Sequence, residues 1–398
     1  MNRYEKYKPT GIEWIGDIPY HWDYFRIKRL SNVKRGASPR PIDDPKYFDD
    51  NGEFGWVRIA DVTASERYLE STTQTLSELG ASLSVKRYPG DFVLSIAGTV
   101  GKPIITKIKC CVHDGFVWFP NLKINPEYLY YIFTTGLPYQ GLGKWGTQLN
   151  LNTDTVGEIF IPLPGENEIE TLVNFLDKKT AQIYKLISNK QKLIDLFKEE
   201  RIAIINEAVS GKGKNWERKK LKYMMNGFDS IRVPLNGDQR GGGEKIYDYY
   251  GASGVIDKVP EYLFDGEYIL IGEDGANLLT RSTALAFKVT GKFWVNNHAH
   301  ILRPKEGDIN YYTYLLESID YTIWVTGSAQ PKLTAENLFN IELLMPSLHE
   351  QNNIVKHIKT ETERIDNTIS KIEKEIELMH EYRIALISEV VTGKIKVI

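Results

Sequence analysis

Cysteines, secretion signals and membrane spans are scarce or missing in this 398-residue chain. Its two cysteines, Cys110 and Cys111, are adjacent, which excludes a disulfide framework and fits a reducing compartment. We expect them in a buried strand rather than at a zinc site. No apolar run reaches the roughly 18 residues of a membrane span, and the N-terminal residues lack the apolar core of a secretion signal. These absences predict a cytoplasmic protein with no membrane partner.

Catalytic signatures are lacking as well. "GTVGKP" carries Pro103 where a phosphate-binding loop needs Ser or Thr. "NPEY" departs at Glu127 from the Asn-Pro-Pro-Tyr motif of adenine methyltransferases and suits the start of a helix. "HAH", residues 298–300, would place both imidazoles on one face of a strand without an evident third ligand. We therefore predict no catalytic residue and no metal site, which favours a binding protein.

A strong net charge of one sign is absent, because the formal net charge is −2. Two stretches are nevertheless locally basic, residues 22–40 and 212–222. Each carries six Lys or Arg residues against one acidic residue. Such stretches suit a phosphate backbone, although two solvated strand or loop faces would have the same composition.

A long internal repeat organises the sequence. "RIAIINEAVSGK", residues 201–212, returns as "RIALISEVVTGK", residues 383–394, with eight of twelve positions identical. The match extends upstream without a gap to Ile159 and Ile341, at a constant offset of 182. This period is far too long for a solenoid repeat. The chain therefore reads as an internal duplication of a globular block followed by a long helix.

The two helices are bounded by recognisable ends. Ser347 and Glu350 form a capping box at the start of the second helix. Gly211 and Gly393 are natural residues just beyond the helix C-termini. Between these ends lie about 44 residues, or about 66 Å of helix.

Apolar residues in both helices follow a heptad pattern, which predicts an antiparallel coiled coil between the two copies. Two ordinary amphipathic helices, each packed on its own block, are the alternative. The predicted seam comprises Val173, Leu176, Ile183, Ile187, Ile194, Phe197, Val355, Ile358, Ile365, Ile369, Ile372, Ile376 and Met379.

The globular blocks contain short runs rich in β-branched and aromatic residues, bounded by Gly, Pro and Asn. Examples are "DFVLSIAG" at 91–98, "TALAFKV" at 283–289 and "KFWVNN" at 292–297. We predict an α+β fold in which two β-rich blocks are joined by two long antiparallel helices. The expected boundaries are 1–158 and 212–340 for the blocks, and 159–211 and 341–398 for the helical segments.

Polar, glycine-containing loops between these strands carry the side-chain types that read base edges, since Arg or Lys pairs with guanine and Asn or Gln with adenine. Exposed loops with other tasks have similar compositions. The candidates for DNA contact are Lys34, Arg35, Arg40, Thr99, Lys102, Lys144, Gln148 and Asn150 in the first block, and Arg232, Arg240, Asn277, Arg281, Gln330 and Lys332 in the second.

Taken together, these features resemble the specificity subunits of type I restriction-modification systems. The resemblance rests on "YKPTGIEWIGDIPYHWDYFRIKRL" at the start, on "AVSGK" and "VVTGK" at the helix ends, and on "IPLP" and "LMPSLHEQ" at the helix beginnings. It covers essentially the whole chain. The near-neutral charge departs mildly from what a DNA-binding family leads us to expect.

The resemblance implies that each block is a target recognition domain that reads one half of a bipartite, asymmetric site in double-stranded DNA. The helices would set the gap between the half-sites and dock two modification (methyltransferase) subunits, and restriction subunits would join the complex. The chain itself would need no cofactor, whereas its partners would use S-adenosylmethionine, ATP and magnesium. A coiled-coil scaffold for proteins, without DNA specificity, is the alternative.

Overall fold

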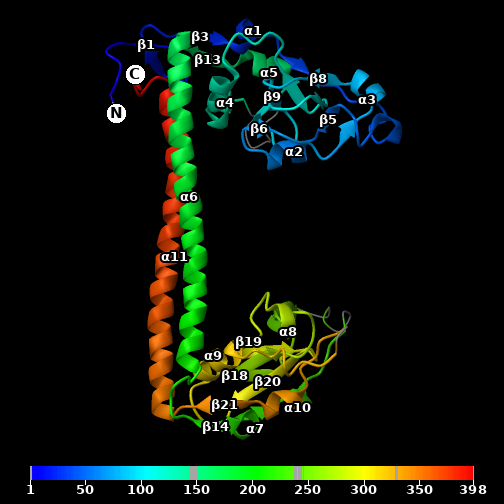
Figure 1. Cartoon of the computed structure of the whole chain (residues 1–398), viewed down its shortest axis with the longest axis vertical. Coiled ribbons are helices and arrows are strands. Elements are labelled where there is room, and N and C mark those ends of the chain that lie inside the picture. Colours follow the sequence, from blue (N-terminus) through cyan, green and yellow to red (C-terminus); the bar gives the residue numbers. More distant parts are fainter. Residues whose placement is uncertain are drawn as a thin grey trace. The chain divides into compact units, whose positions relative to one another are not determined.

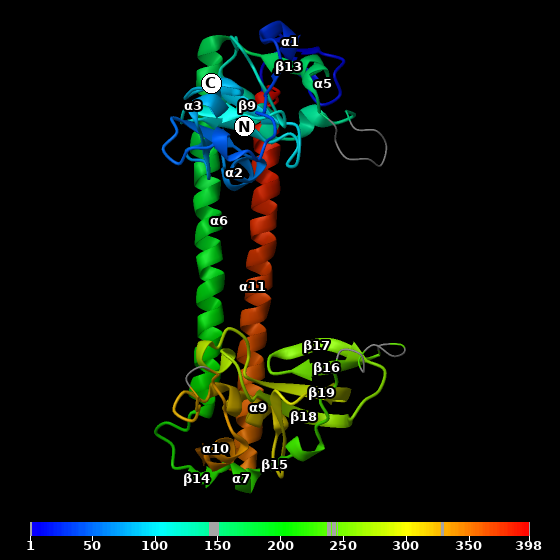
Figure 2. The same cartoon turned by 90° about the vertical axis from the view of Figure 1, so that its right-hand side faces the viewer.

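The computed structural model of the chain contains two units, each with its own cores. Unit 1 comprises Met1–Lys190 and Lys374–Ile398, and unit 2 comprises Gln191–Glu373 (Figures 1 and 2). The structure describes residues 2–142, 151–236, 240, 244, 246–327 and 330–397. Among these residues, no helix has the length and apolar character needed to cross a membrane.

Unit 1 contains two small sheets packed around apolar clusters. The five-stranded sheet has the order β4 (Lys34–Arg35), β12 (Phe116–Trp118), β9 (Phe92–Ser95), β10 (Pro103–Thr106) and β6 (Tyr68–Leu69). The four-stranded sheet has the order β7 (Thr75–Leu76), β5 (Phe54–Val57), β11 (Cys110–Val112) and β8 (Val85–Arg87). Cys110 and Cys111 are buried in β11, as predicted, and burial raises the pKa of both thiols, that of Cys111 to about 11.

Short helices close the ends of these sheets. Asn125 caps α4, because its side chain accepts from the backbone N–H groups of Glu127 and Tyr128. "NPEY" is therefore a helix start, as predicted. The helices of this block are α1 (Ile27–Leu30), α2 (Ile59–Ala64), α3 (Glu78–Ser82), α4 (Pro126–Thr134) and α5 (Thr153–Glu158), with 3-10 turns at Pro45–Tyr47 and Leu137–Tyr139.

Each unit uses a two-stranded ribbon to lead into a long helix. In unit 1, β3 (Asp23–Arg26) pairs antiparallel with β13 (Phe160–Leu163), and α6 follows. In unit 2, β14 (Glu217–Lys220) pairs antiparallel with β21 (Glu342–Met345), and α11 follows. This recurrence agrees with the duplication read from the sequence. A further hairpin, β1 (Tyr7–Pro9) with β2 (Asp17–Pro19), occurs in unit 1.

Unit 2 is built on one six-stranded sheet. Its order is β15 (Met225–Gly227), β20 (Ala299–Pro304), β18 (Phe264–Gly272), β19 (Ala286–Val295), β16 (Tyr247–Gly251) and β17 (Gly254–Val259). Figure 1 shows α9 close to this sheet. The remaining elements are α7 (Leu221–Met224), α8 (Asn277–Thr280), α9 (Ile309–Ser318), α10 (Ala335–Asn340) and a 3-10 turn at Asp229–Ile231.

Two expectations for this sheet were wrong. Residues 283–289 and 292–297 were expected to form separate strands, but they belong to one strand, β19. Gly291 has a φ of +92° and lies opposite Gly266, at +130°, so paired glycines bend the ladder without ending it. The two histidines of "HAH" do not share a strand either, because β20 begins at Ala299 and includes only His300.

The long helices are α6 (Glu166–Val209) and α11 (Leu348–Val391), each of 44 residues as expected. The capping box predicted for α11 is present, since Ser347 N donates to Glu350 Oε2 at 3.0 Å and Glu350 N donates to Ser347 Oγ at 3.4 Å. Gly211 and Gly393 have φ values of +63° and +70°. Both predicted helix ends are therefore confirmed.

In each unit, α6 and α11 run antiparallel. In unit 1, Lys190 pairs with Glu375, and Tyr184 contacts Arg383. In unit 2, Glu200 pairs with Arg364 at 2.8 Å, and Arg201 pairs with Asp366 at 3.4 Å. In unit 1 the partner number falls from 383 to 375 as the residue number rises from 184 to 190. In unit 2, Ile204 and Ala208, which follow Glu200 in α6, line one groove with residues of α11 that precede Arg364. Both observations define the antiparallel direction. The predicted α+β architecture with two long antiparallel helices is confirmed.

The residues assigned to the coiled-coil seam are buried to different degrees. The buried members are Val173, Leu176, Ile183, Ile194, Val355, Ile358, Ile365 and Ile372. The half-buried members are Ile187, Phe197, Ile369, Ile376 and Met379.

Candidate nucleic-acid interface

Two of the arginines predicted to contact DNA converge on one residue, Asp114, in unit 1. Arg35 Nε donates to the carbonyl oxygen of Asp114 at 2.5 Å, and Arg40 Nη2 lies 3.1 Å from its carboxylate. Burial by itself would raise the pKa of Asp114. The hydrogen bond from Ser38 and the charges of Arg40 and Arg35 outweigh this effect and hold the pKa below its ordinary value. The side chain of Arg40 is 72% exposed. The two guanidinium groups beside Asp114 carry more positive charge than its single carboxylate neutralises, so the surface here is positive.

This surface continues along β4, an edge strand of the five-stranded sheet. The ammonium of Lys34 lies 5.8 Å from the ring centre of Trp118, and the guanidinium carbon of Arg87 lies 3.8 Å from it. Cations beside an aromatic ring suit a nucleic acid, which offers both phosphates and bases. Sequence reasoning missed Arg87 and Trp118, because neither lies in a glycine-rich loop. We call this surface the basic edge; it comprises Lys34, Arg35, Arg40, Arg87 and Trp118.

Thr99 and Lys102 lie together at a different place, beside the C-terminal end of α2. The hydroxyl oxygens of Thr99 and Thr63 are 2.7 Å apart. Lys102 Nζ donates to the carbonyl oxygens of Thr63 at 2.9 Å and Ser65 at 2.6 Å. Burial lowers the pKa of Lys102. Its ammonium therefore secures the loop to α2. The remaining candidates of this block, Lys144, Gln148 and Asn150, lie outside the described residues.

In unit 2, Arg232 and Lys332 converge on Glu273. Arg232 Nη1 is 2.5 Å from Glu273 Oε2, and Lys332 Nζ is 3.1 Å from Oε1. Although burial opposes ionisation, the hydrogen bond from Arg232 and the charge of His300 hold the pKa of Glu273 below its ordinary value. Only 14% of the Arg232 side chain is exposed, so this arginine is held inside the fold as the partner of Glu273, whereas 51% of the Lys332 side chain is exposed.

His300 extends the same network. Its Nδ1 lies 2.5 Å from the carboxylate of Asp229, and its Nε2 lies 2.8 Å from the carbonyl oxygen of Leu333. Within the described part of the chain, the ligand atoms of Asp229, Glu273 and His300 form one group with metal-like spacing, all within 4.8 Å of one another. Because Arg232 already neutralises Glu273, we assign this cluster as a buried ion-pair network.

The other candidates of the second block have varied surroundings. Arg240 lies 3.5 Å from Asp257 and over the ring of Tyr249. Arg281 donates to the carbonyl oxygen of Ile319 at 2.6 Å, where it binds the C-terminal end of α9. Asn277 bonds the segment that follows α8: its side chain accepts from the Ser282 hydroxyl and bonds the backbone N–H and carbonyl oxygen of Thr283. Gln330 is exposed. Gln330 and Lys332 thus remain accessible, while Arg240, Asn277 and Arg281 bind neighbouring segments.

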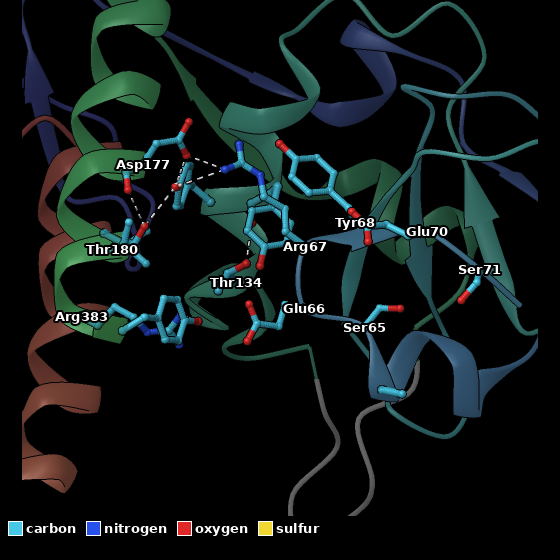
Figure 3. A pocket seen from close by; sticks show the side chains of 16 residues that line it. Ser65, Glu66, Arg67, Tyr68, Glu70, Ser71, Thr134, Asp177, Thr180 and Arg383 are labelled. Atoms are coloured by element: carbon cyan, nitrogen blue, oxygen red, sulfur yellow. Dashed lines mark hydrogen bonds and ion pairs between the residues drawn. The ribbon is translucent and has the colours of Figure 1, made fainter. Parts of the chain in front are cut away.

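A cavity of about 580 Å³ in unit 1 lies between the globular block and the long helices. Figure 3 shows Arg67 pointing toward Asp177 of α6, with Tyr68 nearby. Arg67 Nη1 is 2.5 Å from Asp177 Oδ1, which also accepts from Tyr131 at 2.5 Å. Across the cavity, the guanidinium of Arg383 lies over the ring of Tyr184 at 5.0 Å. These contacts anchor the block to the helices of its unit, a role that no sequence motif indicated.

Known proteins match this chain over nearly its whole length. The family model "Type I restriction modification DNA specificity domain" matches twice, at residues 19–201 and 213–378. A specificity subunit of the EcoprrI type I restriction enzyme, from Escherichia coli, is 22% identical over 88% of this chain and 90% of its own length. A Haemophilus influenzae protein named as a type I restriction enzyme specificity subunit is 34% identical, over 36% of this chain and 37% of that protein.

A solved structure has a similar fold. It is a chain from work on complex assembly and conformational transition of the type I restriction-modification system. The similarity covers 95% of this chain and 99% of that one, with a TM-score of 0.68 and 13% sequence identity. At this identity the likeness speaks for the fold alone.

Proposed function

We propose a function from the premise that this chain belongs to the type I restriction-modification DNA specificity family. In this proposal the chain is the subunit that recognises the DNA sequence, and each of its globular blocks reads one half of a bipartite, asymmetric site. One observation carries the proposal: the family match occurs twice, and each matched segment contains one globular block. The blocks are built on different sheets, so they suit two different half-sites.

The basic edge supplies the electrostatic part of recognition in the first block. Lys34, Arg35 and Arg40 of this edge are exposed, and Arg40 pairs with Asp114. Arg87 pairs with Asp91 at 3.4 Å and lies over Trp118. Other basic residues of 22–40 and 212–222 also have acidic partners. Arg26 and Lys28 both pair with Glu158, for example, and Lys219 pairs with Glu217. In the second block, Gln330 and Lys332 are the exposed candidates.

Two modification subunits dock on equivalent surfaces of the long helices. Large apolar residues are exposed at matching positions of the two copies, 182 residues apart. Leu196 and Ile202 of α6, in unit 2, correspond to Leu378 and Ile384 of α11, in unit 1. In the heptad pattern these four positions lie outside the seam. A duplicated exposed surface suits two copies of one partner.

The complex formed in this way carries the chemistry in its other subunits. Modification subunits methylate adenine with S-adenosylmethionine, and restriction subunits add ATP- and magnesium-dependent cleavage. This chain contributes the choice of site and the distance between half-sites, and it works in the cytoplasm, where the chromosome of a bacterium or an archaeon lies.

Selection from a randomised duplex library tests the proposal. The chain, bound to its modification subunit, should retain duplexes that share two short conserved blocks with an unconserved gap of constant length between them. Retention should fall steeply as salt rises, because phosphate contacts release counterions. A protein scaffold without DNA specificity would retain no shared sequence, and that result would exclude the proposal.

A further inference from the structure

In unit 1, the N-terminal segment covers the ends of the two long helices. The hydroxyl of Tyr4 donates to Glu168 Oε1 at 2.6 Å, and its ring lies edge-on to Trp22 with centroids 5.9 Å apart. The hydroxyl of Tyr7 donates to the carbonyl oxygen of Gly393 at 3.0 Å. The backbone N–H of Lys396 donates to the carbonyl oxygen of Asn2 at 2.8 Å. Residues 2–8, which bend at Glu5, thus lie on a surface formed by α6, Trp22 and the residues that follow α11.

The duplicated surface in unit 2 is an open groove. Its volume is about 430 Å³, and its walls come from α6, α11 and the loop between α6 and β14. Glu350 stands in the place of Glu168, and Trp216 in the place of Trp22. The groove is lined by Ile204, Glu207, Ala208, Lys214, Trp216, Glu350, Asn353, Ile354 and His357.

The residues of the groove are more buried in unit 1 than in unit 2, as expected if unit 2 lacks a segment equivalent to residues 2–8. In unit 1, Leu172, Leu386 and Val390 are at most 2% exposed. Their counterparts 182 residues away, Ile354, Ile204 and Ala208, are only half-buried. The side chain of Glu168 is 11% exposed, whereas Glu350 is exposed. The copies share the groove, but only unit 1 carries residues 2–8 ahead of its tryptophan.

We propose that the groove beside Trp216 binds a tyrosine-bearing peptide segment of another protein. The tyrosine ring packs against Trp216, Ile204 and Ile354, and its hydroxyl donates to Glu350, as Tyr4 does to Glu168. The capping box engages Oε2 of Glu350, and Oε1 corresponds to the oxygen of Glu168 that accepts from Tyr4. A second copy of this chain is not the source, because its residues 2–8 are held in its own unit 1. This inference is independent of DNA recognition.

A synthetic peptide of residues 2–9, NRYEKYKP, is the direct probe, because unit 1 already binds this sequence. It is titrated into the full chain carrying isotope-labelled isoleucine methyl groups. The resonances of Ile204 and Ile354 should shift to saturation with a single site. The same peptide with Tyr4→Ala should bind at least about tenfold more weakly, since a buried aromatic anchor dominates such contacts.

Protein variants locate the site. Ile354→Asp should abolish binding, while the matched control Leu348→Asp, an exposed apolar residue of the same helix outside the groove, should leave it intact. The Tyr4→Ala peptide tests the same contact with an unaltered protein, so a folding defect in Ile354→Asp does not obscure the result. The proposal is overturned if Ile204 and Ile354 do not shift, if both peptides bind equally, or if sedimentation reveals a dimer that Ile354→Asp dissolves.

Discussion

At the scale of the residue, the surroundings of each cation decide its task. Arg40 and Arg232 are the same residue type in similar polar loops, yet 72% of the first side chain is exposed and 14% of the second. Arg232 bonds Glu273 and the carbonyl oxygen of Ala299 within unit 2. The N–H groups of a buried arginine of this kind are directed at acceptors within the fold, so they cannot donate to a base or a phosphate. Arg40 contacts one surface carboxylate, that of Asp114, and can exchange it for phosphate oxygens.

We therefore expect Arg40→Ala to weaken DNA binding about threefold to fivefold at physiological salt and to lower the slope of log affinity against log salt by about one. Stability should change by less than about 0.5 kcal/mol, because the Arg40–Asp114 pair is exposed. Filter binding or anisotropy over a salt series, with the modification subunit present, measures the slope. Lys109→Ala, which removes an exposed ion-paired cation at the opposite end of β11, is the control and should leave the slope unchanged. Equal effects of both changes would contradict the assignment.

At the scale of the element, α6 and α11 are each followed by a glycine, Gly211 or Gly393, that is closely surrounded by the side chains of other segments. A Cβ on Gly211 would lie 2.5 Å from the ring of Trp216 and 3.0 Å from Leu344. A Cβ on Gly393 would lie 2.3 Å from Pro19. Each glycine therefore serves both the left-handed backbone conformation and a close approach of neighbouring chain, by Trp216 and β21 at Gly211 and by the β1–β2 hairpin at Gly393.

Gly211→Ala should destabilise the chain by about 2–4 kcal/mol, which combines about 1–2 kcal/mol for the left-handed conformation with the cost of displacing Trp216. Gly213→Ala is a matched control in the same loop. Gly213 also has a positive φ, +76°, but open space surrounds its Cβ position, so only the conformational cost of about 1–2 kcal/mol applies. Urea unfolding measures both, and equal losses would show that crowding by Trp216 does not matter.

At the scale of the whole molecule, the duplication supplies two blocks, two helix ends and two docking surfaces from one ancestral plan. The copies differ in two respects. Their sheets have different strand orders, and the N-terminal segment covers the groove at the helix ends in unit 1 while the groove in unit 2 stays open. The two long helices differ least in sequence, and contacts between them recur at equivalent positions of the two copies. Arg383 meets Tyr184 in unit 1, and Arg201 meets Asp366 at the same positions of unit 2.

Matched insertions in both helices test whether they set the distance between half-sites. One heptad added after Lys190 in α6 and one before Glu375 in α11 should lengthen the gap by about three base pairs, because seven residues add about 10.5 Å of helix. Selection from a randomised duplex library, or sequencing of methylated adenines in a host, reads the gap. A heptad in α6 alone should abolish recognition by mismatching the seam. An unchanged gap after matched insertion would refute the ruler role.

The sequence by itself determined the features that depend on local spacing. A gap-free offset of 182 residues revealed the duplication, and capping residues with Gly211 and Gly393 placed the helix ends, since these signals lie within a few residues of the structure they specify. Heptads indicated the antiparallel helices. Only the tertiary structure decided which loop cations are accessible, because Arg232 meets Glu273 and Arg281 meets the end of α9 through contacts between distant segments. The same is true of the open groove: the sequence contains both copies, but burial by residues 2–8 in one of them is a property of the folded chain.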